Sequence, residues 1–282
     1  MVSLKDIEFS YRKHELPALT RITAEIGPGV HLLAGEKGAG KTTLLHLIAG
    51  IRKPSSGECL INDEAASSDS PSKMARTFML EENMFFPGPN IRSFAKRHSK
   101  FYPNFSQERF EENLHEFGLT GYEAFKSQSL GNRKKAQLSY VLALGVDVIL
   151  LDEPTNALDI QSKEVLRRLL AGTLRDDQTV IVATHTVSEL ENVFDGAIMI
   201  TRSRLLFAGT DEAVSHRLAF RVTRMPLDSA LYSEIQVGRV LGIYHAIEEE
   251  GLTRTDWRLL YSALHSPQRD DILIALASLN KH

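Results

Sequence analysis

The chain has 282 residues, of which 43% are hydrophobic and 24% are charged, and its formal net charge at pH 7 is -3. These values are typical of a globular protein and exclude the disordered and fibrous classes. They also give no basic field of the kind that attracts a protein to nucleic acid, and the single cysteine, Cys59, excludes an intrachain disulfide and a cysteine-rich metal site.

The first residues carry Lys5, Asp6 and Glu8 where a secretory signal needs an unbroken apolar core. The longest apolar stretch, Val141 to Leu151, is interrupted by Asp147 and is shorter than the roughly 18 residues of a membrane helix. We therefore expect a cytoplasmic protein whose membrane role comes from a partner.

The N-terminal part of the chain alternates apolar and polar residues or carries short β-branched runs, which predict strands. The predicted strands are Val2–Phe9, Ile22–Ile26, Val30–Leu33, Cys59–Ile61 and Thr77–Leu80. Between them, Lys41 to Ala49 follows a glycine-rich bend and predicts a helix.

The period changes from Asn90 to Leu144, where Phe110, Leu114 and Phe117 recur at helical spacing. This stretch predicts a helical insert. Beyond it, strand patterns at Val146–Leu151, Thr179–Ala183 and Ala197–Ile200 alternate with helix patterns at Ile160–Leu174 and Val187–Phe194. Strands that alternate with helices indicate a parallel sheet covered on both faces.

The character of the chain changes again after about Gly209. Two helices are predicted near the end, at Asp256–Leu264 and Pro267–Leu279, the second with Ser266 as its cap. We expect one large domain, residues 1–209, and a small C-terminal extension, residues 210–282.

A phosphate-binding loop is predicted between the strand Val30–Leu33 and the helix that follows it. The segment fits G-x-x-x-x-G-K-[ST], in which backbone N–H groups surround the phosphates, the lysine supplies a charge and the Thr/Ser hydroxyl binds Mg²⁺. The residues assigned to nucleotide binding here are Gly35, Glu36, Lys37, Gly38, Ala39, Gly40, Lys41, Thr42 and Thr43, with Thr42 also a metal ligand. A chance glycine turn is the alternative.

Two acids end the buried strand Val148–Leu151. Asp152 stands where P-loop ATPases hold Mg²⁺, and Glu153 is placed to orient and polarise the attacking water. The alternative is a strand that stops at two solvated acids.

The segment LLDEPTNALD, Leu150 to Asp159, followed by VIVATH, Val180 to His185, resembles the order of motifs in the ATP-binding-cassette (ABC) family. The resemblance implies that Glu153 is catalytic, that His185 contacts the γ-phosphate and that Asp159 communicates across a dimer. It covers about residues 2–209. Within the family, FYPNF at Phe101–Phe105 looks like bacterial exporters whose permease is a separate polypeptide.

The family also implies roles for residues outside these motifs. Tyr11 lies where an aromatic ring stacks on adenine, although Phe9 or His14 would serve as well, and packing on the sheet is the alternative. The family's signature segment falls on residues 128–132, where Ser129 and Gly131 match it and would serve the nucleotide of the other subunit, while Leu130 adds bulk.

The family's glutamine in the loop before the helical insert falls on Glu81. A carboxylate there is able to reach Mg²⁺, so Glu81 joins Thr42 and Asp152 as a metal ligand, or it is an ordinary loop acid. The run Met84–Phe86 next to Pro87 favours a surface for the permease, or it fills the core of the insert.

These observations predict an α/β fold: a P-loop NTPase core sheet with an antiparallel β portion, a helical lobe at about residues 90–144 and a small C-terminal extension. The expected activity is hydrolysis of ATP, with Mg²⁺, between two such cassettes that drive a membrane permease. The expected partners are a second cassette, identical or different, and the permease, with no nucleic acid. The chain would lie at the inner face of the cell membrane. The alternatives are a non-transport ABC protein and a nucleotide sensor without hydrolysis.

Overall fold

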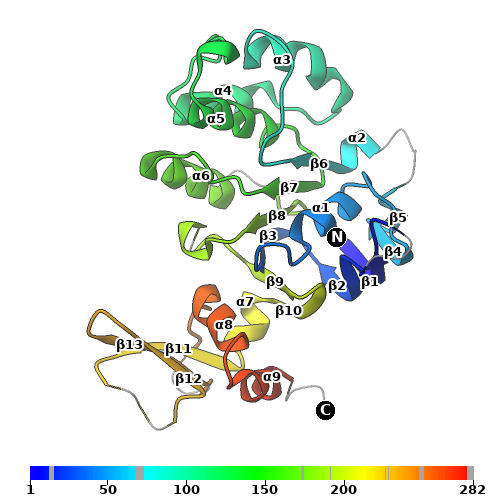
Figure 1. Cartoon of the computed structure of the whole chain (residues 1–282). Helices are drawn as coiled ribbons and strands as arrows, with labels where there is room; N and C mark the ends of the chain where they lie inside the picture. Colours follow the sequence, from blue (N-terminus) through cyan, green and yellow to red (C-terminus); the bar gives the residue numbers. More distant parts are fainter. Residues whose placement is uncertain are drawn as a thin grey trace.

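The structure is a computed structural model that describes residues 1–12, 16–67, 73–172, 175–190, 192–225, 227, 229–247 and 251–277. Figure 1 shows a central sheet with a helical lobe at one end and a smaller unit, built from the C-terminal residues, at the other.

A six-stranded sheet forms the centre, in the order β10-β9-β3-β8-β7-β6. Its inner strands are parallel, and only β10 runs antiparallel to its neighbour β9. The strands are β3 (Gly29–Gly35), β6 (Thr77–Leu80), β7 (Val148–Asp152), β8 (Thr179–Thr184), β9 (Gly196–Thr201) and β10 (Arg204–Thr210). Strand β10 was not predicted.

Both faces of this sheet are buried, as the alternation of strands and helices predicts. Leu33 and Leu150 face a core that includes Leu44 of α1 (Lys41–Ile48). Leu32 and Leu151 face a second core that includes Leu166 of α6 (Ile160–Gly172). Because successive side chains of a strand point to opposite faces, each strand contributes to both cores.

The antiparallel portion is a separate four-stranded sheet in the order β2-β1-β4-β5. Its strands are β1 (Val2–Phe9), β2 (Leu19–Ile26), β4 (Ser56–Ile61) and β5 (Glu64–Ala65). The apolar residues of β1 and β2 pack in the same core as α1.

The helical lobe is confirmed. Residues 90–144 are all described and contain α3 (Ile91–His98), α4 (Gln107–Glu116) and α5 (Leu130–Val141), with single 3₁₀ turns at Ser99–Phe101 and Phe125–Ser127 and no strand. A four-residue helix, α2 (Lys73–Arg76), precedes β6.

The side chains of Asn90, Ser106 and Ser129 cap α3, α4 and α5 by accepting a hydrogen bond from the backbone N–H three residues on. Phe86 is buried in the lobe, stacked on Phe94 with 4.3 Å between ring centroids, whereas Phe85 is 78% exposed.

One predicted helix is wrong. Residues 187–190 form a single 3₁₀ turn, Val187–Leu190, in place of a helix that continues to Phe194. The backbone has turned left-handed at Asn192, with φ 67°, and the chain enters β9 at Gly196, so no room remains for further helical turns. The apolar spacing in this segment reflects burial of Val187 and Leu190 and not a longer helix.

The C-terminal extension holds more structure than its sequence predicts. It consists of α7 (Asp211–Ser215), a three-stranded antiparallel sheet in the order β11-β13-β12, α8 (Trp257–Leu264) and α9 (Arg269–Ala277). The three strands are Leu218–Thr223, Tyr232–Gln236 and Arg239–His245.

Both predicted C-terminal helices exist. In α8, Asp256 caps the first turn by accepting from Leu259 N. The second helix, α9, begins at Arg269, two residues later than expected, because the Ser266 hydroxyl accepts from Gln268 N in a tight turn before it. The expected ends of α6 at Leu174 and of α9 at Leu279 lie outside the described residues.

Candidate functional site

The predicted phosphate loop joins β3 to α1, at the end of a central parallel strand. Two of its glycines have left-handed backbone angles, Gly38 with φ 84° and Gly40 with φ 106°. A Cβ on Gly40 would lie 2.8 Å from the carbonyl oxygen of Ala18, so only glycine fits there. The loop therefore turns sharply and leads into the N-terminus of α1, where unpaired N–H groups attract an anion.

Lys41 is folded back onto this loop. Its Nζ donates to the carbonyl oxygens of Gly35, at 2.7 Å, and Glu36, at 3.3 Å. Burial lowers the pKa of Lys41, and the nearby charges of Glu153 and Asp152 oppose that shift. A buried ammonium held by neutral carbonyls is available to exchange them for phosphate oxygens.

Thr42 and Asp152 meet at the foot of the cleft. The Thr42 hydroxyl donates to Asp152 Oδ2 at 2.8 Å, which joins the first turn of α1 to the end of β7. Burial raises the pKa of Asp152, the charges of Glu153 and Glu82 act in the same direction, and the Thr42 hydroxyl opposes them. A hydroxyl beside a carboxylate is a pair of oxygen donors that suits Mg²⁺.

Glu153 is held in a strained backbone conformation, with φ 46°, directly after β7. Its Oε1 accepts a hydrogen bond from His185 N at 3.1 Å and lies 2.8 Å from His185 Nδ1. Its Oε2 is buried, and no described residue bonds to it. One carboxylate oxygen is thus anchored to the end of β8 while the other is left for a water molecule.

Tyr11 also lines the cleft. Its hydroxyl lies 2.8 Å from Thr43 Oγ1, within hydrogen-bond distance, so the ring is tied to the helix that carries the phosphate loop. Of the two substitutes considered for it, Phe9 is buried, and His14 lies outside the described residues.

These residues surround one cleft of about 670 Å³. Ten of the predicted site residues line it, and they are Tyr11, Lys37, Gly38, Gly40, Lys41, Thr42, Thr43, Asp152, Glu153 and His185. Gly35, Glu36 and Ala39 belong to the loop but do not line the cleft. Gly35 instead allows a close approach of β9, since a Cβ there would lie 2.6 Å from the carbonyl oxygen of Ile200.

Besides Ala18, two polar residues in the cleft were missed by sequence reasoning. Glu82 and Asn156 both line it, and Asn156 Nδ2 donates to Glu82 Oε1 at 2.6 Å. Asn156 lies within the quoted LLDEPTNALD segment, where its polar amide three residues after Glu153 was the available signal. Glu82 had no signal beyond its position beside Glu81.

Glu81 itself lies elsewhere. Its Oε1 is 2.9 Å from His46 Nε2 on α1, and the residue does not line the cleft. The chain turns after β6, with Met84 N donating to Glu81 O at 3.3 Å, so that Glu81 faces His46 on α1 while Glu82 lines the cleft. The metal-binding role of Glu81 stays a prediction, and Glu82 is a second candidate.

The predicted signature residues lie away from the cleft. The Ser129 hydroxyl caps α5 by accepting from Asn132 N at 3.2 Å, and a Cβ on Gly131 would lie 2.5 Å from Ala157 O. Asp159 accepts from Ser162 N at 2.8 Å at the start of α6, and this backbone hydrogen bond lowers the pKa of Asp159. The side chain of Leu130 is 72% exposed. In this conformation these residues do not serve the cleft of their own chain.

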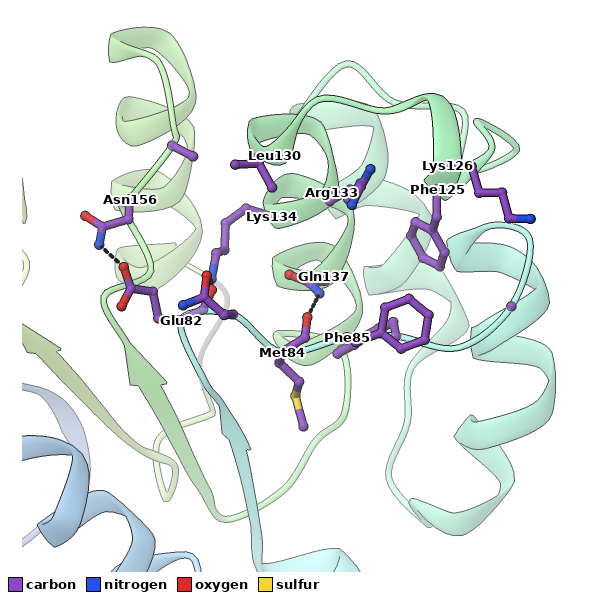
Figure 2. A pocket seen from close by; sticks show the side chains of 14 residues that line it. Glu82, Met84, Phe85, Phe125, Lys126, Leu130, Arg133, Lys134, Gln137 and Asn156 are labelled. Carbon is purple, nitrogen blue, oxygen red and sulfur yellow. Dashed lines mark hydrogen bonds between the residues drawn. The ribbon is translucent and has the colours of Figure 1, made fainter.

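A second cavity, of about 560 Å³, lies between the helical lobe and the loop after β6. Figure 2 shows Phe85, Phe125 and Leu130 on this groove with Lys126, Arg133 and Lys134. Glu82 and Asn156 line both cavities, so the hydrogen bond between them separates the groove from the cleft.

Among the described residues, no His, Cys, Asp and Glu side chains gather in a group of three that would hold a metal alone. The oxygen donors that the cleft offers to a cation include the Thr42 hydroxyl and the Asp152 carboxylate. No helix in the described part of the chain is long and apolar enough to cross a membrane.

The fold and the cleft define a P-loop nucleoside triphosphatase. A model of the ABC transporter family matches residues 19–156. The thiamine import ATP-binding protein of Salmonella typhimurium is 30% identical over 219 residues, covering 75% of this chain and 93% of the relative. An energy-coupling factor transporter ATP-binding protein of Methanospirillum hungatei is 30% identical over 239 residues, covering 80% of this chain and 59% of the relative.

Solved structures share the fold. The ATP-binding subunit of an ABC transporter has a TM-score of 0.67 at 19% identity, covering 76% of this chain and 91% of that chain. A dimeric cassette in a post-hydrolysis state, bound to ADP and Pi, has a TM-score of 0.62 at 23% identity, covering 74% of this chain and 98% of that chain.

The chain belongs to the ABC transporter family, as one of its ATP-binding subunits. It binds ATP and is an ATPase, as its resemblance to the family implies. The thiamine import protein is named for import, and the name of the energy-coupling factor protein states no direction, so the exporter sub-assignment made from Phe101–Phe105 stays a prediction.

Proposed function

We propose that this chain hydrolyses Mg-ATP at the interface with a second cassette and thereby drives a separate membrane permease. The observation that carries the proposal is the position of Glu153. It has one oxygen fixed by His185 and the other buried with no partner among the described residues, in the same cleft as the phosphate loop and the Thr42–Asp152 pair.

In this mechanism the phosphate loop and Lys41 bind the phosphates, and Tyr11 stacks on the adenine. Thr42 and Asp152 hold Mg²⁺, with Glu81 or Glu82 as a further oxygen donor, because carboxylate and hydroxyl oxygens are its preferred ligands. When bound, Mg²⁺ would neutralise part of the negative charge of the phosphates.

Glu153 orients the attacking water and accepts its proton as the water oxygen bonds to the γ-phosphorus. The bond from that phosphorus to the bridging oxygen breaks, which releases ADP and phosphate. His185 is 58% exposed on its side chain, so it is free to turn from Glu153 to the γ-phosphate when the nucleotide binds.

The second cassette completes the site. Ser129, Gly131 and Asp159 do not line the cleft of their own chain, which supports their service to the nucleotide of the partner. Ser129 opens α5, so the N–H groups of its first turn point outward toward such a ligand. The extent of the nucleotide-binding domain, residues 1–209, with 210–282 as an extension, is part of this proposal.

The permease contacts the groove of Figure 2. The exposed ring of Phe85 is an apolar surface that an isolated subunit has little reason to present, and the cations Lys126 and Arg133 lie along the same groove. A cytoplasmic segment of the permease that is apolar, with an acidic residue, fits this chemistry. Through it the subunit lies at the inner face of the cell membrane.

Separable roles for Lys41 and Glu153 test the mechanism. Lys41→Ala should weaken ATP binding itself, because the loop loses its charge. Glu153→Gln should bind ATP normally and stop turnover, so that ATP and Mg²⁺ accumulate a closed dimer detectable by size-exclusion chromatography. Turnover of Glu153→Gln equal to that of the parent protein would remove Glu153 from the mechanism.

A further inference from the structure

An arginine lies against the tyrosine at the end of the nucleotide cleft. Arg52 follows α1, where its backbone N–H donates to the carbonyl oxygen of His46 at 3.1 Å. The central carbon of its guanidinium lies 4.8 Å from the centroid of the Tyr11 ring and 5.8 Å from that of Phe9. Both distances are within the roughly 6 Å over which a cation is attracted to an aromatic face.

The Tyr11 ring is held at two further points. Phe9, buried at the end of β1, meets it edge to face, with 5.1 Å between centroids and 84° between the ring planes. The Tyr11 hydroxyl lies 2.8 Å from Thr43 Oγ1. Phe9, Arg52 and Thr43 thus fix a side chain that is otherwise 52% exposed and would sample several rotamers.

The contacts are also one-sided. Tyr11 lines the nucleotide cleft, whereas Arg52 and Phe9 do not. The guanidinium therefore covers ring surface outside the cleft and leaves the surface inside it open to a flat ligand. Offset stacking of a base on that open surface is the arrangement that aromatic rings favour.

We propose that Arg52 is a positioning residue for the nucleotide base, which acts by holding the Tyr11 ring ready for adenine. The inference rests on the proposed function, in which Tyr11 stacks on the base. Ordering a free side chain on binding costs entropy, and a ring that is already held avoids that cost. Arg52 should thus affect binding of the base and not the chemical step, because it lies outside the cleft that holds Glu153.

Arg52→Met tests the inference, since methionine keeps an unbranched stem and removes the cation. We expect KM for ATP to rise about two- to fivefold, the size of a cation–π contact at an exposed site, with little change in kcat. Arg52→Lys retains a cation and should restore most of the loss. In a Tyr11→Leu background, which has no ring to hold, Arg52→Met should have no further effect.

Inorganic tripolyphosphate distinguishes this inference from the proposed function. The full-length parent protein should bind both ATP and tripolyphosphate with Mg²⁺, and Arg52→Met should weaken only ATP. If the parent binds neither ligand, the proposed function fails and takes the inference with it. If both ligands bind and Arg52→Met weakens them equally, or changes neither, Arg52 does not act on the base. If Arg52→Met weakens ATP binding as much in the Tyr11→Leu background as in the parent protein, Arg52 acts through a residue other than Tyr11.

Discussion

Within the signature segment, Leu130 is the residue whose bulk conflicts most with the segment's predicted role of binding the partner's nucleotide. It opens α5 beside the capping residue Ser129, and its side chain is 72% exposed. If that side chain keeps the partner's nucleotide from the donors at the start of α5, Leu130→Gly should raise ATPase turnover. This subunit would then be slow as a homodimer and work best opposite a cassette with a more glycine-rich signature.

The expected loss of folding stability in Leu130→Gly is smaller than the expected effect on the catalytic barrier, so the two can be told apart. Full burial of a leucine stabilises by about 1.5–3 kcal/mol, so the small buried part of Leu130 accounts for less than about 1 kcal/mol, and glycine at an N-terminal helix position costs at most about as much again. The variant should therefore fold. Loss of one well-placed hydrogen-bond donor to the charge that develops in the transition state costs about 2.7–4 kcal/mol, or two to three powers of ten in rate. Leu130→Gly would gain up to that factor in rate if it restored such a donor.

The assay is steady-state ATPase activity at protein concentrations where the dimer is verified. Leu130→Met, which conserves volume, is the matched control and should behave as the parent. Gly131→Ala should move in the opposite direction, because its Cβ would lie 2.5 Å from Ala157 O and displace the start of α5. Unchanged turnover in a dimeric Leu130→Gly, at a rate normal for such enzymes, would refute the steric argument and leave no reason to expect a different partner.

Three other predictions follow from the site. Gly40→Ala should abolish ATP binding measured by calorimetry, since alanine is strained at φ 106° and meets Ala18 O, whereas Gly172→Ala, with open space around it, should bind normally. Burial raises the pKa of Asp152, so the contribution of this carboxyl to folding stability is present below the ordinary aspartate pKa near 4 and is lost as pH rises through the pKa of the folded state. Asp152→Asn should flatten that part of the pH dependence of urea unfolding. An unaltered pH profile in the variant would contradict this prediction. A cysteine introduced at Asn83 or Asn90 should cross-link to the permease. The native Cys59 should stay unreactive, because it is buried and its thiol pKa is raised to about 12. Cross-linking of the permease only from a cysteine at the exposed Val237 would place the contact on the C-terminal extension.

The phosphate loop and the acids after β7 could be predicted because their chemistry is local. Gly35 to Thr42 lies in one continuous segment, and Asp152 ends, and Glu153 follows, a strand that is buried throughout. The pairing of Glu153 with His185 was not predictable in the same way. It depends on β7 and β8 being neighbours in the sheet, which periodicity alone does not establish.

Glu82 lines the cleft and Glu81 does not, a difference that the sequence does not indicate. Counting from Phe86 and Pro87 placed the metal ligand on Glu81, but the turn after β6 decides which of the two neighbouring acids faces the cleft, and residue order does not show that turn. In the C-terminal extension, β12 and β13 were missed although Val237 and Gly238, both with positive φ, form the turn between them. Gly238 is an ordinary turn residue, but valine at positive φ is unusual, so the pair does not match a familiar turn sequence.

The packing of α8 gives the protein a built-in fluorescent reporter for movement of His185. Trp257 is the single tryptophan of the chain, it is buried, and its indole Nε1 donates to Phe194 O at 3.3 Å. A small cavity joins it to Val187, two residues beyond His185. Any movement of His185 that shifts the Val187–Leu190 turn changes the packing around this indole, so its fluorescence should follow nucleotide binding without an added label.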